Sequence, residues 1–540
     1  MRNSWTDNIR RGISVMALVP VLAWTGPALA QELAPEQILH RGNGAEPQTL
    51  DPHRAEGVPA SNILRDLYEG LTAEAPNGDL VPGGAERWEI SDDGRVYTFY
   101  LRRDARWSNG DPVTAADFAY GLRRSADPAT LSKYSQILSS IENAEAVIAG
   151  DMPPEALGVE VLDDYTLEVR LKAPTPYFLG LLSHSSTYPA HRASIEEHGD
   201  RFSRPGNLVG NGAYFLHNWV VQSHVHLKRN PHYWGNADVV LDEVYFHATE
   251  DQSSELKRYR AGELHFTNEV PLAQVRWIRE NMPEEFRVST YLGTYYYGFN
   301  LTQPPFKGNK ALRRALTMAI QREIITEKVT RLGEQPAYSW VPPGVNNYTA
   351  QIPEWSRWPW PRQLEEARRL YAEAGYGPDN PLHIELRYNT SENHKKVAVA
   401  IAAMLKQNLG VRVNLVNEEW KVFLQNRKQK RVTQLFRAGW IGDYNDAYTF
   451  SELMHSKHGI NDSAYNSPRY DALLEQASVE GDEARRREIL EEAERLMLED
   501  QPIMPIYFYV SKKMVSPRLD GFVPNIMDRH YSKHFRLLAR

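Results

Sequence analysis

The 540-residue sequence contains no cysteine. This absence excludes disulfide bonds, thiolate metal ligands and a cysteine nucleophile. It also means that no cysteine follows the N-terminal segment to carry a lipid anchor. If the chain is exported, we therefore expect it to be free of such an anchor.

Long hydrophobic runs are scarce as well. The longest, Ile13–Trp24, is too short to span a bilayer. It follows a stretch with three arginines and precedes the small-residue motif Ala28-Leu29-Ala30, which is the order of a secretory signal peptide. We expect residues 1–30 to be removed, which leaves about 510 residues, enough for two or three domains. Export without an anchor predicts the periplasm of a double-membrane bacterium as the location.

Neither sign of charge dominates the sequence, which has 62 Lys and Arg against 69 Asp and Glu. The charges are interspersed, and this argues against a nucleic-acid partner. Aromatic side chains with a polar tip are abundant instead, with 13 Trp and 28 Tyr. Such side chains suit the burial of an amphipathic ligand, although a large core with many aromatic residues would have the same composition.

Catalytic and nucleotide-binding motifs are also absent, since the sequence has no G-x-S-x-G, H-E-x-x-H or G-x-x-x-x-G-K-[ST]. The G-N-G motifs at 42–44 and 210–212 lack a third glycine and are interpreted as turns. His224 and His226 would share one strand face, where a metal ion is conceivable. With no third ligand in view, we favour an exposed strand pair. We expect no enzyme activity, no cofactor and no metal ion.

The first half of the chain predicts short strands and capped helices. Residues 88–101 and 158–172 each have the pattern of a β-hairpin, and Thr114 is the expected N-cap of a helix between them. A further helix is expected over residues 61–71, with Ser61 or Asn62 as its cap. Residues 69–192 therefore form a separate α+β module in this interpretation.

The second half predicts a different class of domain. Helical and strand patterns alternate from a helix over residues 311–325 onward, which is typical of an α/β domain with a largely parallel sheet. A long helix over about 482–500 and a strand over 503–510 follow.

One stretch of this half, R-A-G-W-I-G-D-Y-N-D-A-Y-T-F at 437–450, combines an acid with aromatic residues. It follows a predicted strand that ends near Trp440 and continues into a turn-forming loop. Ligands of open α/β sheets bind beyond the carboxyl ends of strands, so this loop is a candidate site. The alternative is that Asp443 and Asn445 make an Asx turn or cap the next helix.

Eight stretches in a consistent order give the sequence a family resemblance. The chain resembles the extracytoplasmic solute-binding proteins of the peptide-transport group, in particular the periplasmic oligopeptide-binding proteins of ABC importers. The stretches are EPQTLDPHRAEGVPASNILRDLYEGL (46–71), LRRDARWSNGDPVTAADFAYGLRRSADP (101–128), PGNLVGNGAYFLHNWV (205–220), RNPHYWGNA (229–237), TYYYGFNLTQPPF (294–306), YNTSENHKKVA (388–398), NEEWKVFLQNR (417–427) and RAGWIGDYNDAYTF (437–450).

The resemblance implies an α/β, bilobal periplasmic-binding-protein fold with an additional α+β domain and a hinge that closes over the ligand. Domain I would comprise residues 31–68, 193–292 and 511–540, domain II residues 69–192, and domain III residues 293–510. The implied function is binding of short peptides by their termini and backbone, with delivery to the membrane permease of an ABC transporter, and the protein would be a monomer. A cell-wall peptide, a dipeptide, haem or a nickel complex is the alternative ligand on the same fold.

The resemblance also implies a role for individual residues. Asp443 matches the position that pairs with the amine of the peptide, and Arg427, Arg437 and His394 match positions for the carboxylate. The peptide backbone would add to the segments Glu56-Gly57-Val58 and 437–441 like a strand. The residues implied at the site are Asp443, Arg437, Arg427, His394, Trp440, Trp420, Gly439, Ile441, Glu56, Val58, Tyr134, Tyr291 and Tyr296.

Simpler interpretations stay open for several of these residues. Arg427 lies in the charge run NRKQKR, which is usually a solvated helix face. His394 could only cap the helix that it begins, and Trp420 and Trp440 could be core residues. The tyrosines of TYYYGF could alternate between core and surface along a strand.

Two departures from the family pattern concern the carboxylate end of the ligand. The family member that we compare has a lysine where this chain has Thr330, although Arg331 is adjacent. It also has one residue fewer between the two arginines than separates Arg427 from Arg437.

Overall fold

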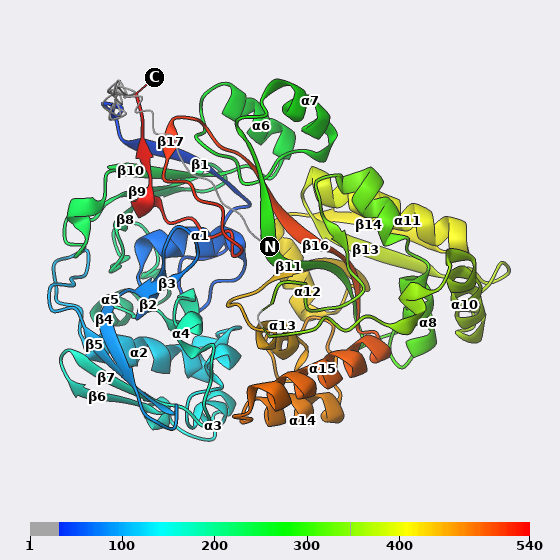
Figure 1. Cartoon of the computed structure of the whole chain (residues 1–540), viewed down its shortest axis with the longest axis horizontal. Coiled ribbons are helices and arrows are strands. Elements are labelled where there is room, and N and C mark those ends of the chain that lie inside the picture. Colours follow the sequence, from blue (N-terminus) through cyan, green and yellow to red (C-terminus); the bar gives the residue numbers. More distant parts are fainter. Residues whose placement is uncertain (1–31, 346, 540) are drawn as a thin grey trace, which may run out of the picture.

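The computed structural model describes residues 32–345 and 347–539, so the predicted signal peptide lies outside the described residues. Two lobes lie side by side, with the long strands β11 (Phe286–Phe299) and β16 (Ile503–Met514) between them (Figure 1). Within the described ranges, no helix is long and apolar enough to cross a membrane.

The first lobe contains a four-stranded sheet in the order β1-β10-β9-β8, in which only the β1–β10 pair is parallel. Helix α1 (Val58–Leu67) packs on this sheet, and Leu39, Leu64 and Phe246 belong to their common core. The strands are β1 (Ile38–Gly44), β8 (Tyr214–Val220), β9 (His224–Arg229) and β10 (Glu243–Ala248).

The predicted bounds of α1 were wrong. The helix begins three residues before Ser61, at Val58, with Gly57 as its N-cap at φ 81°. Pro59 stands near the helix start, where its missing N–H costs no hydrogen bond, and only glycine adopts such a positive φ without strain. Asn62 is therefore inside the helix rather than at its cap.

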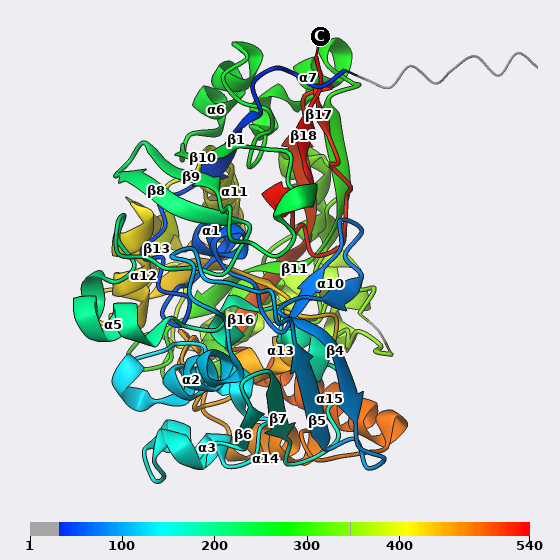
Figure 2. The same ribbon diagram turned by 90° about the vertical axis from the view of Figure 1, so that its left-hand side faces the viewer.

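The additional α+β module belongs to the same lobe, because one continuous hydrophobic core includes residues of both. Its antiparallel sheet has the order β4-β5-β7-β6 and lies at the far end of the molecule from α6 (Gln252–Arg260) and α7 (Val275–Asn281) (Figure 2). Both predicted hairpins are present, and Thr114 makes a capping box with Asp117 at the start of α2. The elements are β2 (Thr72–Glu74), β3 (Leu80–Pro82), β4 (Ala85–Ile90), β5 (Val96–Leu101), β6 (Val159–Asp163), β7 (Thr166–Arg170), α2 (Ala115–Ala126), α3 (Ala144–Ala149), α4 (Phe178–Leu181) and α5 (Arg192–His198).

The second lobe is built on a six-stranded sheet in the order β12-β16-β11-β15-β13-β14. The prediction of a largely parallel sheet was wrong, since β13 is parallel to β14 and β15 but every other pair is antiparallel. Parallel pairs need helical crossovers, and only the segment from β13 to β15 provides them. The other elements are β12 (Gln335–Pro336), β13 (His383–Asn389), β14 (Arg412–Glu418), β15 (Leu435–Ile441), α10 (Trp360–Glu373), α11 (Glu392–Leu409), α12 (Trp420–Gln429), α13 (Tyr448–Ser451), α14 (Pro468–Ala477) and α15 (Glu483–Asp500).

The single helix predicted over residues 311–325 was also wrong. Helix α8 (Lys310–Met318) ends early, and α9 (Arg322–Ile324) leads into a π-helical segment at Ile325–Thr330. Tertiary contacts override the local helical pattern here, because the buried guanidinium of Arg322 donates to the carbonyls of Ala337 and Pro505, each at 2.8 Å.

The strands β11 and β16 pair in two separate blocks. Residues 286–290 of β11 pair with residues 510–514, residues 294–298 pair with residues 503–508, and the register shifts between the blocks. After β16 the chain returns to the first lobe, where β17 (Leu519–Asp520) pairs with β18 (Arg536–Leu537), while α6 (Gln252–Arg260) and α7 (Val275–Asn281) flank the long strands (Figure 1).

Candidate ligand-binding site

Two adjoining cavities lie between the lobes, with about 910 and 1080 Å³ of empty space. All thirteen site residues predicted from the sequence line them. Asp443, Arg427, Trp440, Tyr134, Tyr296 and Glu56 line the first cavity, His394 lines the second, and Arg437, Gly439, Ile441, Trp420, Val58 and Tyr291 line both. We refer to the two cavities together as the groove.

Asp443 follows the end of β15 and is only 8% exposed. Among the described residues, the one ion-pair contact of its carboxylate is with His184, whose Nε2 lies 3.4 Å from Oδ1. Burial holds the pKa of His184 well below its usual value, and the charges of Arg529 and Arg65 lower it further, so this imidazole is neutral. Burial raises the pKa of Asp443 to about 7, against the opposing charges of Arg529 and Arg65. The carboxyl group of Asp443 is thus buried, and no charged side chain among the described residues forms an ion pair with it.

The alternative of a turn or cap role for Asp443 finds no support in these contacts. The backbone N–H of Asp443 donates to Thr449 Oγ1 at 3.1 Å and its carbonyl accepts from Arg529 at 2.6 Å. The local side chain–backbone bond is made by Asp446 instead, whose Oδ1 accepts from the N–H of Tyr448 at 2.8 Å. The carboxylate of Asp443 is left for another partner.

Two buried arginines of the groove differ in their partners. Arg427 is not a solvated residue: its Nε lies 2.5 Å from Asp462 Oδ2, and both side chains are buried. Arg437 donates to Tyr509 Oη at 2.5 Å and to Asn389 Oδ1 at 3.3 Å, both neutral groups. Within residues 32–345 and 347–539, Arg437 has no carboxylate at ion-pair distance, so it is a buried cation without an anion.

The backbone of β15 has a free edge between Arg437 and Asp443. On one side, residues 437–441 pair with β11, but on the other side β13 reaches only Leu435 and Phe436. At Gly439 a Cβ would lie 2.3 Å from Tyr509 Oη, so the absence of a side chain lets Tyr509, which accepts from Arg437, pack closely against the backbone of β15. From the first lobe, the backbone of Gly57 approaches Trp420 so closely that a Cβ would lie 2.9 Å from its ring.

Aromatic side chains form much of the wall. The ring of Tyr134 lies 4.9 Å from His184 and 6.1 Å from Trp440, centroid to centroid. Trp440 donates to the carbonyl of Thr449 at 2.7 Å, whereas the buried Nε1 of Trp420 has no hydrogen-bond partner in the described residues. Tyr296 belongs to a core cluster and also lines the first cavity, so it has a core role, and its role as a ligand contact stays a prediction.

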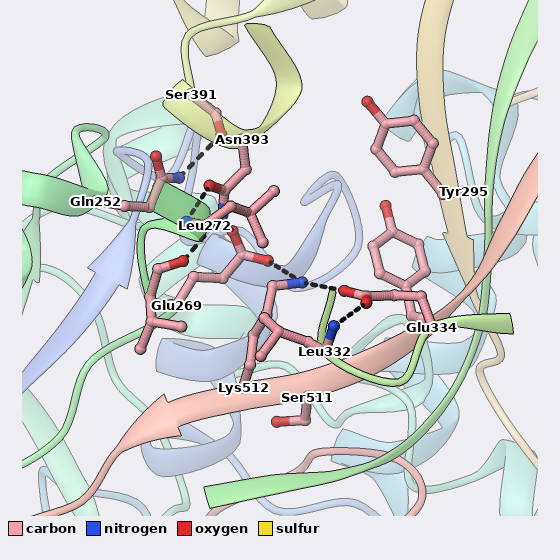
Figure 3. A network of polar contacts seen from close by, with 12 residues as sticks. Gln252, Glu269, Leu272, Tyr295, Leu332, Glu334, Ser391, Asn393, Ser511 and Lys512 are labelled. Carbon is pink, nitrogen blue, oxygen red and sulfur yellow. Dashed lines mark hydrogen bonds and ion pairs between the residues drawn. The ribbon is translucent and has the colours of Figure 1, made fainter. Parts of the chain in front are cut away.

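A polar network closes the second cavity between the lobes (Figure 3). Lys512 Nζ lies 3.4 Å from Glu269 and 3.3 Å from Glu334, so its charge is already compensated. Asn393 donates to Glu269 at 3.1 Å, and Gln252 donates to Ser391 at 2.9 Å, which ties α6 to the start of α11.

His394 is part of the wall of the second cavity, but its side chain carries no charge. Burial holds its pKa well below the usual value, and Arg437 and Lys512 lower it further. The helix cap is Ser391, which accepts the backbone N–H of His394 at 3.3 Å, so the imidazole itself does not cap. His394 can offer a hydrogen bond to a carboxylate, not a positive charge.

Thr330, the first departure from the family pattern, is a neutral residue outside the groove. Thr330 is buried, donates to the carbonyl of Thr326 at 3.2 Å and lines neither cavity. The adjacent Arg331 is exposed and donates to the carbonyl of Lys328, so it does not replace a lysine at the groove.

Sequence reasoning missed several residues of the groove, because no local pattern marks them. Arg65, His184, Asp528, Arg529, Lys512, Lys513 and the half-buried Glu250 all line it. His224 and His226, considered as metal ligands, lie on β9 instead, and His226 Nε2 is 2.8 Å from Glu243. The described residues contain no group of three or more potential ligands arranged for a metal ion.

The lobes contact each other on both sides of the groove. Lys428 pairs with Glu56, and the rings of Tyr177 and Tyr444 stack at 4.6 Å. With the network of Figure 3, these contacts define a closed conformation.

Comparison with known proteins identifies the family to which this fold belongs and distinguishes between its conformations. Residues 79–462 match the family model described as bacterial extracellular solute-binding proteins, family 5 Middle. The chain is 43% identical to the periplasmic oligopeptide-binding protein OppA of Salmonella typhimurium over 511 residues, covering 94% of each chain.

Solved structures agree with this match. The complex of Haemophilus influenzae OppA with RPPGFSPFR superposes with a TM-score of 0.92 at 39% identity, over 94% of this chain and 100% of that one. A structure of the Escherichia coli murein tripeptide binding protein MppA gives the same TM-score, identity and coverage. An unliganded open form of MppA gives a TM-score of only 0.65, over 94% of this chain and 99% of that one. The bilobal fold expected from the sequence is confirmed, and the chain belongs to the family 5 bacterial extracellular solute-binding proteins.

Proposed function

We propose that this chain is the periplasmic substrate-binding component of an ABC peptide importer. It binds short peptides by their termini and backbone, largely independently of their side chains, and delivers them to the membrane permease. The observation that carries the proposal is the pair of buried, uncompensated charges, Asp443 and Arg437, joined by the free edge of β15.

Asp443 supplies the charge that a peptide amine needs. Hydrogen bonds between charged groups are short and roughly twice as strong as neutral ones. An ionised carboxylate in a closed and dry groove without a partner costs several kcal/mol. Closure is therefore favourable mainly when an ammonium group accompanies it, which couples ligand binding to the closed conformation.

Arg437 is the best receptor for the peptide carboxylate, because its planar guanidinium binds carboxylates bidentately and its charge is not yet used. Arg427 adds to the positive field but shares its charge with Asp462. Six residues span at most about 20 Å between Arg437 and Asp443. The guanidinium of Arg437 lies beside Gly439, which shortens the distance between the two charges. Peptides of three or four residues fit such a separation.

The backbone of the peptide pairs with residues 437–441, whose outer edge is free, and with Glu56-Gly57-Val58 from the other lobe. Main-chain pairing of this kind contributes affinity without reading side chains. Trp420, with its unpartnered Nε1 at the junction of the two cavities, is a further donor to the ligand.

The register shift of β11 against β16 is the proposed hinge. It lies close to the expected boundaries, which assign residues 31–68, 193–292 and 511–540 to domain I, 69–192 to domain II and 293–510 to domain III. Hinge closure around a ligand is the usual motion of periplasmic binding proteins. The protein acts as a monomer in this proposal, performs no catalysis and reaches the periplasm after removal of residues 1–30.

A cell-wall peptide is the second candidate ligand, favoured by the equal structural similarity to the murein tripeptide binding protein. A thermal-shift screen tests both, with ligand-stripped protein and mixed tripeptides, tetrapeptides, murein tripeptide, haem and a nickel chelate. At 100-fold over the dissociation constant, a ligand adds about 2.7 kcal/mol of stability. Stabilisation by ordinary peptides is expected, and a shift with haem or nickel alone would contradict the proposal.

A further inference from the structure

The charged side chains of the first cavity are not all accounted for by a peptide with two charged termini. Seven line the cavity, and four of them already have ion-pair partners: Glu56 with Lys428, Arg427 with Asp462, Asp528 with Lys513, and Arg529 with Glu74. Three are left without a carboxylate or cation partner among the described residues, namely Asp443, Arg437 and Arg65.

Arg65 stands in the last turn of α1, and four residues of this helix, Val58, Ser61, Asn62 and Arg65, line the first cavity. Its side chain is half-buried, and its Nη1 donates to Asn62 Oδ1 at 3.2 Å. This amide is neutral, and within residues 32–345 and 347–539 no carboxylate lies within 4.0 Å of the guanidinium. Most of its five N–H donors are therefore available to a ligand.

Arg65 lies at the Asp443 end of the groove, because it lines the first cavity together with Asp443 and does not line the second. Its helix also contacts Ser185–Thr187, which directly follow His184, the residue whose Nε2 is 3.4 Å from Asp443 Oδ1. The charge of Arg65, second to that of Arg529, lowers the pKa of Asp443 against the effect of burial. It also lowers the pKa of His184 and opposes the raised pKa of Tyr291, both of which line the same cavity. Arg65 therefore lies near the place where the peptide amine is proposed to bind.

A zwitterionic peptide pairs its ammonium with Asp443 and its carboxylate with Arg437, and leaves the charge of Arg65 unmatched. Closure removes water from that guanidinium and brings the ammonium of the ligand close to it, and both effects are unfavourable. A carboxylate on a side chain near the amine removes both costs, because it binds the planar guanidinium through two parallel N–H donors.

We propose that Arg65 binds the side-chain carboxylate of the first or second residue of the ligand, so that peptides with Asp or Glu near their N-terminus are the preferred substrates. This inference rests on the proposed peptide-binding function and refines it. Recognition by termini and backbone still admits other peptides, and Arg65 adds a preference among them.

Calorimetry with matched tripeptides tests the inference. Ala-Glu-Ala and Ala-Gln-Ala differ by one charge at the second residue, Glu-Ala-Ala and Gln-Ala-Ala at the first, and Ala-Ala-Glu and Ala-Ala-Gln at the third as a positional control. The wild type is expected to bind the Glu form about tenfold to a hundredfold more tightly at the first or second position, and within about threefold at the third.

Three variants locate the effect. Arg65→Gln should bring the Glu and Gln forms within about threefold of each other without weakening the Gln form, and Arg65→Lys, which keeps the charge, should restore part of the preference. Arg279→Gln, an exposed arginine of α7 outside the groove, should bind like the wild type. Equal affinities for Glu and Gln forms in the wild type, or a preference that persists in Arg65→Gln, would overturn the inference while leaving the proposed function intact. Failure of every peptide to bind, Gln forms included, would overturn both.

Discussion

Asp443 and Lys512 are both buried charged side chains of the groove, but their surroundings are opposite. Lys512, in the second cavity, lies between Glu269 and Glu334 within a network that joins the lobes (Figure 3). Asp443, in the first cavity, has only the neutral imidazole of His184 at ion-pair distance among the described residues. Glu269 and Glu334 together raise the pKa of Lys512 despite its burial, whereas burial raises the pKa of Asp443 to about 7.

The difference indicates what each region is for. A buried charge with its own partners stabilises the contact between the lobes whether or not a ligand is present. A buried charge without a partner is costly until a ligand supplies one. The same contrast separates Arg427, which pairs with Asp462, from Arg437, which has neutral partners only. In the proposed function, the uncompensated charges are therefore the ligand contacts, and the compensated charges belong to the framework around them.

The largest expected effect of a single substitution is that of Asp443→Asn. The change keeps the shape and removes the charge, so that a buried ammonium loses its counter-ion at a cost of about 3–5 kcal/mol. Calorimetry with a tripeptide should show a loss of affinity of roughly two to four orders of magnitude. Lys512→Met serves as the contrast, and we expect it to affect stability more than the recognition of the amine.

The two arginines give the second comparison. Arg437→Gln should reduce the affinity for a free peptide about tenfold to a hundredfold, because a charged hydrogen-bond partner of the carboxylate is lost. Arg427→Gln should change that affinity by less than about fivefold and instead lower the stability by about 3 kcal/mol, since Asp462 loses its buried partner. Urea unfolding together with calorimetry separates the two outcomes, and a reversal of the pattern would invalidate the distinction.

Gly439→Ala tests whether the close packing of Tyr509 and Arg437 against the backbone of β15 is needed. The new Cβ would lie 2.3 Å from Tyr509 Oη and 3.2 Å from Arg437 Nη2, so one of these side chains must move. We expect a loss of about tenfold for all peptides alike, at about 1.4 kcal/mol. A loss confined to peptides with large side chains would indicate a side-chain pocket at this position instead of backbone pairing.

The last prediction concerns the pH dependence of the closed form. In the empty closed form the pKa of Asp443 is about 7, against 3.8 for an exposed carboxyl group. The closed form therefore binds more protons than an open form between these pH values, so its stabilisation is full below 3.8 and is lost as the pH rises through 7. Scattering from ligand-free protein should show a more compact particle at pH 5 than at pH 8. Asp443→Asn should abolish the part of the difference that comes from Asp443. Any part that comes from Glu452, another buried acid nearby with a raised pKa, should remain.

The sequence allowed the fold and the lining of the groove to be predicted, but not the partners within it. The hairpins at 88–101 and 158–172 follow from their turn residues, and the thirteen lining residues from the family resemblance. The mixed direction of the sheet could not be predicted, because β11 and β16 are set by long-range pairing across both lobes. Nor does any local pattern place Asp462 against Arg427, or Arg65 and Arg529 near Asp443.

Calorimetry on one tripeptide in its free, N-acetylated and C-amidated forms tests the central claim most directly, with the wild type, Asp443→Asn and Arg437→Gln. Acetylation should weaken binding strongly to the wild type and to Arg437→Gln but hardly to Asp443→Asn, whose amine site is already lost. Amidation should weaken binding to the wild type and to Asp443→Asn but much less to Arg437→Gln. Equal losses for all three proteins would contradict the assignment of the two uncompensated charges to the two ends of a peptide.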